Sequence, residues 1–259
     1  MKQRILTAII GLVIVIPILL IGSWPFIIFT YLLAMIALLE LLKIKKKKTW
    51  IFPSVLAILF QWTILLYATD IPFSIEPNRI LILFVMLLLV YIVLSKNAFS
   101  FTEAGFILIA SLYVTFGFYF VLEARMEGLN YLLFILFVIW TTDTGAYFFG
   151  RAFGKTKLWP EISPNKTVAG AVGGVLLAAI TTIVFQFVYP FSIGLLPILA
   201  VGISISIVGQ VGDLVASAIK RHYNIKDFGY ILPGHGGIMD RLDSLIFVLP
   251  YLHFIQFIA

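Results

Sequence analysis

Residues 25–48 read PFIIFTYLLAMIALLELLKIKKKK, an apolar run with a single acid, Glu40, that ends in a cluster of lysines. A helix needs about 20 apolar residues to cross the hydrocarbon layer of a membrane. Lysines beside such a helix mark its cytoplasmic end. The run therefore predicts a transmembrane helix over 25–42 that ends inside the cell. We interpret Lys45 to Lys48 as a solvated anchor that touches anionic lipid.

Comparable apolar runs recur along the chain, so we predict an all-α integral membrane protein with about nine transmembrane helices. Of its 259 residues, 62% are hydrophobic and 12% are charged, whereas a soluble domain is about half apolar and about a quarter charged. Lipid must therefore cover much of the surface. The predicted spans are 5–22, 25–42, 51–69, 80–95, 104–122, 131–149, 168–189, 191–211 and 245–258.

The basic residues orient these spans. With a cytoplasmic N-terminus, all but two of the 18 Lys and Arg residues lie in inside segments, and only Arg79 and Arg125 lie outside. Short loops rich in Lys and Arg stay in the cytoplasm. We predict one polytopic domain over 1–259, mainly spans over 1–130 and catalytic over 131–259, in a bacterial plasma membrane. Function is expected at the long polar inside loops, 150–167 and 212–244.

The charged residues and the missing cysteines limit the partners. The net charge is +6, but the basic residues lie between apolar runs. They indicate lipid headgroups or phosphorylated substrates rather than nucleic acid. Without cysteine there are no disulfides or thiolate metal sites, and the three histidines are not spaced for zinc. Oxygen ligands are therefore the expected metal chemistry, and the sequence leaves a homo-oligomer open.

The first polar loop is entered through Asp143, at the edge of a predicted span. An ionisable residue there is costly and is a functional candidate, although it could also be a structural acid bonded to neighbouring threonines. Further on, Gly154, Lys155 and the sequence SPNKT over 163–167 offer the small residues, lysines and hydroxyls that suit a phosphate. An ordinary basic loop is the alternative.

The second polar loop begins with GDLVASAIKR over 212–221. In a helix, an acid, a hydroxyl and a base would share one stripe there, namely Asp213, Ser217 and either Lys220 or Arg221.

The same loop ends with PGHGGIMDRLDS over 233–244, where three glycines surround His235 and allow the backbone to approach a ligand closely. Asp240, Asp243 and Ser244 share a helical face. The N-terminal amides of that helix also favour anions.

Four carboxylates and four Lys or Arg side chains between residues 213 and 243 have two interpretations. They form a structural lattice of salt bridges, or the acids hold a divalent cation and the bases hold the phosphates that it bridges. Mg²⁺ is usually bound by one or two carboxylates plus substrate phosphates. The glycines, histidine and serines among the charges favour the second interpretation.

Residues 217–243, SAIKRHYNIKDFGYILPGHGGIMDRLD, resemble the C-terminal pattern of the phosphatidate cytidylyltransferases, also called CDP-diacylglycerol synthases, without a departure. DTGAY over 143–147 and Gly154-Lys155 also look like family elements. SPNKTVAG over 163–170 resembles the family's S-P-K-K-T-x-E-G, with Asn165 in place of Lys and Ala169 in place of Glu.

The resemblance implies that phosphatidic acid and CTP react, with Mg²⁺, to give CDP-diacylglycerol and pyrophosphate. It assigns Asp213 and Asp240 to the metal. The catalytic candidates are Asp213, Asp240, Lys220, Arg221, His235, Asp227 and Asp243; the substrate-binding candidates are Asp143, Lys166, Thr167, Ser217, Lys226 and Arg241.

Three other functions stay open at this point. A related CTP-dependent enzyme would act on another lipid phosphate or a polyprenol. A transporter would spread ionisable residues through several spans near the midplane, whereas Glu40 and Asp143 lie near the inside ends of theirs. A purely structural scaffold would leave the glycine-rich histidine segment unexplained.

The predicted orientation can be tested by cysteine labelling, because the chain has no cysteine of its own. In intact cells, a membrane-impermeant thiol reagent should label Glu76→Cys, in an outside loop, and should not label Asp227→Cys, in an inside loop. Both variants should label after the cells are opened, which controls for reactivity. The reverse pattern in intact cells would overturn the orientation.

Overall fold

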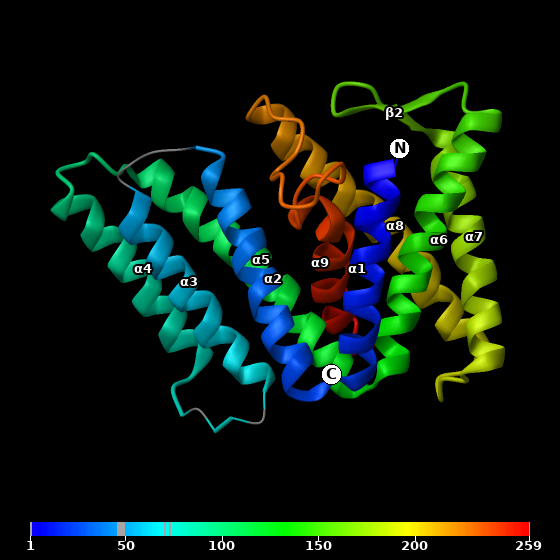
Figure 1. The fold of residues 1–259 in the computed structure, drawn as a ribbon, viewed down its shortest axis with the longest axis horizontal. Helices are drawn as coiled ribbons and strands as arrows, with labels where there is room; N and C mark the ends of the chain where they lie inside the picture. Colours follow the sequence, from blue (N-terminus) through cyan, green and yellow to red (C-terminus); the bar gives the residue numbers. More distant parts are fainter. Residues whose placement is uncertain (1, 46–49, 70, 73, 259) are drawn as a thin grey trace. The chain divides into compact units, whose positions relative to one another are not determined.

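The computed structural model in Figure 1 describes residues 2–45, 50–69, 71–72 and 74–258. Almost all of its regular structure is helical, with one pair of short strands. The helices are α1 (Lys2–Ile21), α2 (Ser23–Lys43), α3 (Ile51–Leu65), the 3-10 turn η2 (Leu66–Ala68), α4 (Pro77–Leu94), α5 (Phe101–Glu127), α6 (Leu129–Phe153), α7 (Val168–Val188), α8 (Leu195–His222) and α9 (Met239–Phe254); the strands are β1 (Lys157–Trp159) and β2 (Ser163–Thr167).

In the part of the chain that is described, a helix lies at each of the nine predicted spans. Seven of them are long and apolar enough to cross a membrane; α1 and α9 are not among the seven. The all-α membrane fold is therefore confirmed, whereas the number of crossings and their orientation stay predictions. Of the predicted lysine anchor, Lys46 to Lys48 lie outside the described residues, and the Lys45 ammonium lies 4.8 Å from the centre of the Phe106 ring.

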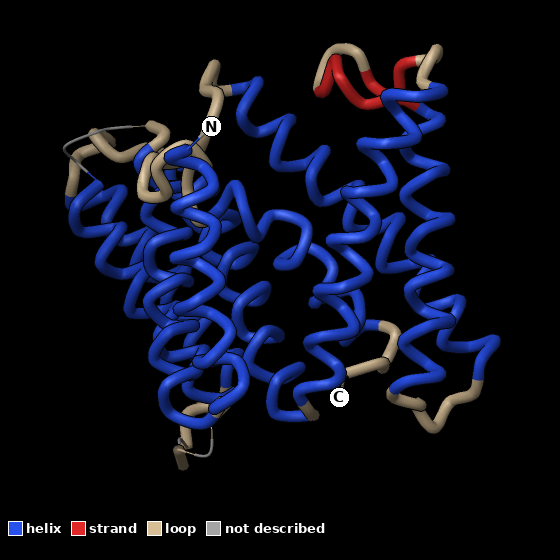
Figure 2. Tube along the Cα trace, turned by 45° about the vertical axis from the view of Figure 1, so that its right-hand side comes forward, coloured by secondary structure: helices blue, strands red, loops and turns tan. Residues whose placement is uncertain are grey.

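The two polar loops contain more regular structure than the sequence predicted. α8 continues to His222, so residues 213–221, which were predicted to begin a loop, are helical, and the condition for the shared stripe is met. The loop over 150–167 holds an antiparallel hairpin, in which Lys157 pairs with Thr167 and Trp159 with Ser163. Figure 2 shows these strands in red between α6 and α7. The hairpin places the SPNKT segment on a strand.

Backbone contacts divide the chain into two compact units. Unit 1 comprises 1–123 and 227–241, and unit 2 comprises 124–226 and 242–259. This division differs from the predicted one near residue 130, because the segment with the glycine-rich histidine loop belongs to unit 1. The single polytopic domain stays a prediction.

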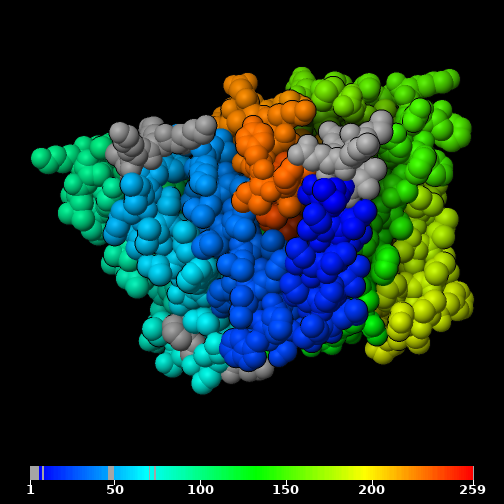
Figure 3. Space-filling view, viewed as in Figure 1, coloured from blue at the N-terminus to red at the C-terminus, as the bar shows by residue number. Residues whose placement is uncertain are grey.

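Unit 1 is built from apolar helices that pack in chain order, α1 on α2, α2 on α3 and α3 on α4. Phe60 of α3 stacks on Phe84 of α4 with 4.6 Å between the ring centres. The loop over 227–238 joins this unit, where the Thr7 hydroxyl of α1 donates a 3.0 Å hydrogen bond to the Pro233 carbonyl. In the space-filling view, this orange loop lies beside the blue surface of α1 (Figure 3).

Unit 2 is a close bundle of α6, α7 and α8. Glycines allow the backbones of α6 and α7 to approach, because a Cβ at Gly145 would lie 2.6 Å from the Gly173 carbonyl oxygen, and one at Gly173 would overlap Phe149. Small residues at a helix interface permit this contact within a membrane. The packing brings the end of α6, the hairpin and the middle of α8 together around one cavity.

Candidate active site

Unit 2 contains a cavity of about 210 Å³ between the hairpin and three helices. It includes predicted site residues from both polar loops, which are far apart in sequence. Its lining residues are Asp143, Ala146 and Tyr147 of α6; Leu158, Asn165, Lys166 and Thr167 of the hairpin; Gly170 and Ala171 of α7; and Gln210 and Asp213 of α8.

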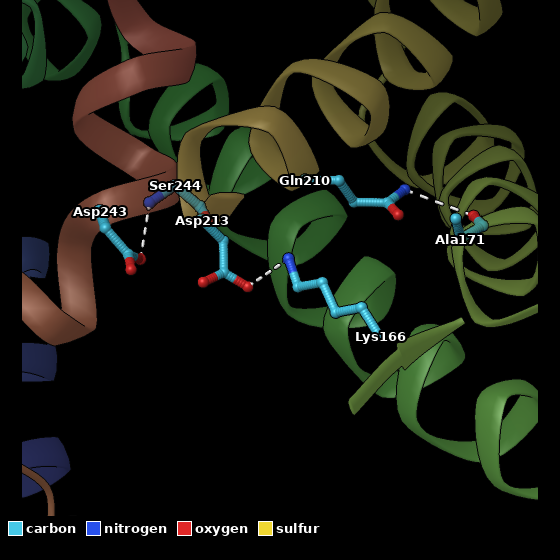
Figure 4. Close-up of polar contacts among 6 residues, drawn as sticks. All are labelled: Lys166, Ala171, Gln210, Asp213, Asp243 and Ser244. Atoms are coloured by element: carbon cyan, nitrogen blue, oxygen red, sulfur yellow. Dashed lines mark hydrogen bonds and ion pairs between the residues drawn. The ribbon is translucent and has the colours of Figure 1, made fainter. Parts of the chain in front are cut away.

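The central contact of this cavity is an ion pair. Figure 4 shows Lys166 reaching from β2 to Asp213 on α8, and the Lys166 Nζ lies 2.5 Å from the Asp213 Oδ2. The two side chains are 25% and 35% exposed, and partly exposed pairs contribute about 1 kcal/mol or less to stability. The pair is therefore expected to contribute little to the stability of the fold.

Three carboxylates gather in unit 2. Figure 4 shows the carboxylates of Asp243, on α9, and Asp213, on α8, turned in the same direction. The Asp243 Oδ1 accepts a 2.8 Å hydrogen bond from the Ser244 amide. Burial, together with the negative charges of Asp213 and Asp143, raises the pKa of Asp243 to about 7, although the Ser244 amide and Lys220 oppose the shift. Such a concentration of negative charge is an environment that a divalent cation would relieve.

Thr167 has a structural contact as well as a place in the cavity wall. It is the N-cap of α7, and its hydroxyl accepts a 3.1 Å hydrogen bond from the Gly170 amide. An N-cap oxygen satisfies an amide that the helix itself leaves unpaired. Its predicted contact with substrate stays a prediction.

The other predicted bases of unit 2 lie at the end of α8. Lys220 and Arg221 are in its last turn, one helical turn after Ser217. Lys226 follows in the connecting loop. The Arg221 Nε donates a 3.2 Å hydrogen bond to the Ile162 carbonyl, between β1 and β2. Arg221 therefore ties the hairpin to α8.

The remaining candidates lie in the loop of unit 1. The Asp240 Oδ2 accepts hydrogen bonds from the amides of Phe228, at 2.8 Å, and Gly237, at 3.0 Å. The Arg241 Nε donates a 2.8 Å hydrogen bond to the His235 carbonyl. These contacts hold the ends of the loop together, so Asp240 and Arg241 have structural roles that the sequence did not predict.

Inside this loop, Gly236 has a φ of +88°, which favours glycine. A Cβ there would lie 3.1 Å from the Asp240 Oδ2 and 3.3 Å from the Asp227 Oδ1. The His235 Nδ1 is buried and has no hydrogen-bond partner among the described residues. Two predicted acids, Asp240 and Asp227, thus lie close to the backbone of Gly236, the residue that follows His235.

The start of α9 differs from the expectation of an anion site. The amides of Ile238 and Met239 donate to the Glu40 carboxylate at 3.2 and 3.0 Å, and the Gly237 amide donates to Asp240. Helix N-terminal amides bind a ligand anion only where no internal acceptor holds them. The protein's own acids occupy these amides, so they are not available to a ligand anion.

The donor chemistry fits a hard divalent cation. Among the described residues, no group of three or more His, Asp or Glu side chains is arranged to hold a metal ion. Mg²⁺ needs only one or two carboxylates when the remaining ligands are phosphates and water. Asp213 and Asp243, which interact electrostatically, would supply that smaller number of carboxylates.

A model of the "Cytidylyltransferase family" matches residues 2–259. The chain belongs to this family. The phosphatidate cytidylyltransferase of Bacillus subtilis is 45% identical over 261 residues, covering 98% of this chain and 97% of the relative. The protein of the same name from Staphylococcus haemolyticus is 49% identical over 255 residues, covering 98% of both. The family predicted from residues 217–243 is confirmed.

Membership of the cytidylyltransferase family also confirms the prediction of a nucleotidyltransferase. The predicted activity, phosphatidate cytidylyltransferase, is the one that these relatives are named for. The apolar helices and the bacterial relatives agree with a multi-pass protein of a bacterial membrane.

Gln210, Tyr147 and Glu40 were not among the site residues predicted from the sequence. The Gln210 Nε2 donates to the Ala171 carbonyl at 3.3 Å and so links α8 to α7 at the cavity wall. A signal was present, because Gln210 is an amide in an apolar span and lies one turn before Asp213 on the same helix. Tyr147 lies within the DTGAY segment, but nothing in the sequence pointed to its place in the wall.

The raised pKa of Asp243 predicts how stability depends on pH. The unfolded chain ionises this carboxyl near its ordinary pKa of about 3.9, whereas the folded protein does so at about 7. The stability that the neutral form contributes is therefore present below about pH 4 and is lost as the pH rises through about 7. Asp243→Asn stays neutral and keeps an oxygen for the Ser244 amide.

We expect Asp243→Asn to unfold at a higher temperature than the wild type at about pH 8, with the difference shrinking as the pH falls to about 5. Thermal unfolding in detergent with a chelator, which removes divalent cations, measures it. A difference that stays constant over this range would contradict the raised pKa.

Proposed function

We propose that this chain transfers CMP from CTP to phosphatidic acid, giving CDP-diacylglycerol and pyrophosphate for phospholipid biosynthesis. The observation that carries the proposal is the cavity of unit 2. Lys166, a residue of the kind that binds phosphate, forms an ion pair with Asp213 there, and Asp143 lines the same cavity. Relatives that match almost the full chain are named phosphatidate cytidylyltransferases.

In this reaction, a phosphate oxygen of the lipid attacks the α-phosphorus of CTP. The new P–O bond forms as the bond to the β-phosphate breaks, and pyrophosphate leaves with that bond's electron pair. Both reactants are anions, so much of the barrier is charge repulsion and misalignment. The side chains that we assign to phosphate neutralisation are Lys166, Lys220, Arg221, Lys226 and Arg241.

We assign Mg²⁺ to Asp213 and Asp240, with Asp227 and Asp243 as second choices. When bound, Mg²⁺ neutralises and aligns the phosphate oxygens of the nucleotide. Asp240 is already oriented by two backbone amides. His235 is the remaining candidate for moving a proton or contacting phosphate.

The chemistry of the substrates suits a membrane enzyme. Phosphatidic acid is held in the lipid layer, whereas CTP comes from the cytoplasm. We therefore place the cavity at the cytoplasmic face of a bacterial plasma membrane, with lipid around the apolar helices. Another lipid phosphate as acceptor is the alternative that the substrate test resolves.

Purified protein should form pyrophosphate and a CMP-bearing lipid from CTP, phosphatidic acid and Mg²⁺. Diacylglycerol lacks the attacking phosphate and should give no product. Product is measured by lipid chromatography with labelled CTP. Faster turnover of a polyprenyl or ether-lipid phosphate would reassign the acceptor, and full activity in excess chelator would remove the metal role.

Asp213→Asn and Asp240→Asn should each lower turnover by about two orders of magnitude or more, because Asn keeps an oxygen but loses the charge that holds a hard cation. The double variant should cost little more than either single variant, since groups that act as a unit are not additive. Specific activity per folded protein is the measurement.

The contrasting expectation is that Asp213 serves only its ion pair with Lys166 and that Asp240 serves only the loop amides. In that case the variants would reduce the yield of folded protein, and the surviving fraction would work normally. Near-wild-type specific activity for either variant would refute its assignment.

A further inference from the structure

Glu40 is a buried acid of α2 whose partners are distant in sequence. Its side chain is 4% exposed. Its two oxygens accept hydrogen bonds from the amides of Ile238, at 3.2 Å, and Met239, at 3.0 Å. All three residues belong to unit 1. A buried carboxylate is costly unless such donors satisfy it, so this contact is specific.

The amides that Glu40 binds are the ones that a helix cannot satisfy by itself. Met239 is the first residue of α9, and the first amides of a helix have no partner within it. A negative charge at that end is also favourable because of the helix dipole. Glu40 therefore fixes where α9 begins, one residue before Asp240.

Two glycines of the loop close around the same carboxylate. A Cβ at Gly229 would overlap the Glu40 Oε1, and one at Gly237 would overlap the Glu40 Oε2. At Gly229, the three nearest atoms all belong to Glu40. Neither glycine has a φ in the left-handed region. These glycines are thus explained by the space that Glu40 occupies, rather than by backbone conformation.

We propose that Glu40 is a positioning residue for the cytidylyl transfer, acting through the loop that carries His235 and through Asp240. Glu40 binds the amides of Ile238 and Met239, and Asp240 binds those of Phe228 and Gly237. Because Glu40 holds the amides of Ile238 and Met239, Asp240 keeps its hydrogen bonds to the amides of Phe228 and Gly237. Without Glu40, Asp240 is the acid in the first turn of α9 and would compete for the vacated amides.

The proposal rests on the proposed function, because turnover is one of its readouts. Glu40→Ala should lower kcat by about a hundredfold, the scale expected when a reacting group is misplaced by about 1 Å. Glu40→Gln keeps the length and one acceptor oxygen, and should lower kcat by about tenfold. The KM for CTP should change by less than about threefold, because Glu40 does not line the cavity with Lys166.

Glu103 provides a matched control in the same unit. It is also 4% exposed, and its Oε2 accepts a 2.7 Å hydrogen bond from the Ser100 amide at the start of its own helix, α5. Glu103→Gln removes the same charge from the same kind of contact without touching the loop. It should leave kcat within about twofold of the wild type. An equal loss in both Gln variants would show a general effect of losing a buried acid and would overturn the proposal.

A second test does not depend on activity. Gly229→Ala should lower the unfolding temperature of the otherwise wild-type protein, because its methyl group would collide with the Glu40 carboxylate. In a Glu40→Ala background that carboxylate is absent, so the further decrease should be less than half as large. Equal decreases in the two backgrounds would show that Glu40 does not set the space at Gly229.

The two tests separate the failure of this inference from the failure of the proposed function. A wild-type protein inactive with CTP and phosphatidic acid would refute the proposed function, while the Gly229 and Glu40 coupling would still decide whether Glu40 shapes the loop. An active wild-type protein with a normal kcat in folded Glu40→Gln would refute the positioning role alone.

Discussion

A charged group that is buried in this protein needs a partner in place of water, because hydrocarbon cannot solvate it. The two polar loops and the adjoining helix ends hold the predicted site residues. Three carboxylates, two of them in these segments and one on α2, have hydrogen-bond or ion-pair partners. Glu40 has two backbone amides, Asp240 has two others, and Asp213 has Lys166. The apolar helices determine where such groups can lie, and the polar loops determine what they can do.

The cavity depends on helices that approach closely. Gly145 and Gly173 remove the side chains that would separate α6 from α7, and the hairpin that joins these helices then lies against α8. Lys166 consequently reaches an acid that is 47 positions later in the sequence. Because the resulting pair is partly exposed, it contributes little to stability and leaves both groups able to meet a charged substrate.

In unit 1, two acids and one arginine hold the polar loop together. Glu40 and Asp240 hold the amides at the start of α9 and at Phe228, and Arg241 holds the His235 carbonyl. The N-terminus of α9 therefore has a structural role. The amides of Gly237, Ile238 and Met239 are therefore already bound, and our proposal assigns the phosphates to Lys and Arg side chains instead.

The sequence by itself determined the features that depend on local composition and spacing. Apolar runs of membrane length predicted the helices, the helical period showed that Asp213 and Ser217 would share a stripe if they lay on a helix, and the continuous pattern over 217–243 identified the family. Only the tertiary structure decided the hairpin, the pairing of Lys166 with Asp213, and the contact of Glu40 with amides 198 and 199 positions away. These contacts depend on how separate helices pack, and the periodicity of one segment carries no information about its partner.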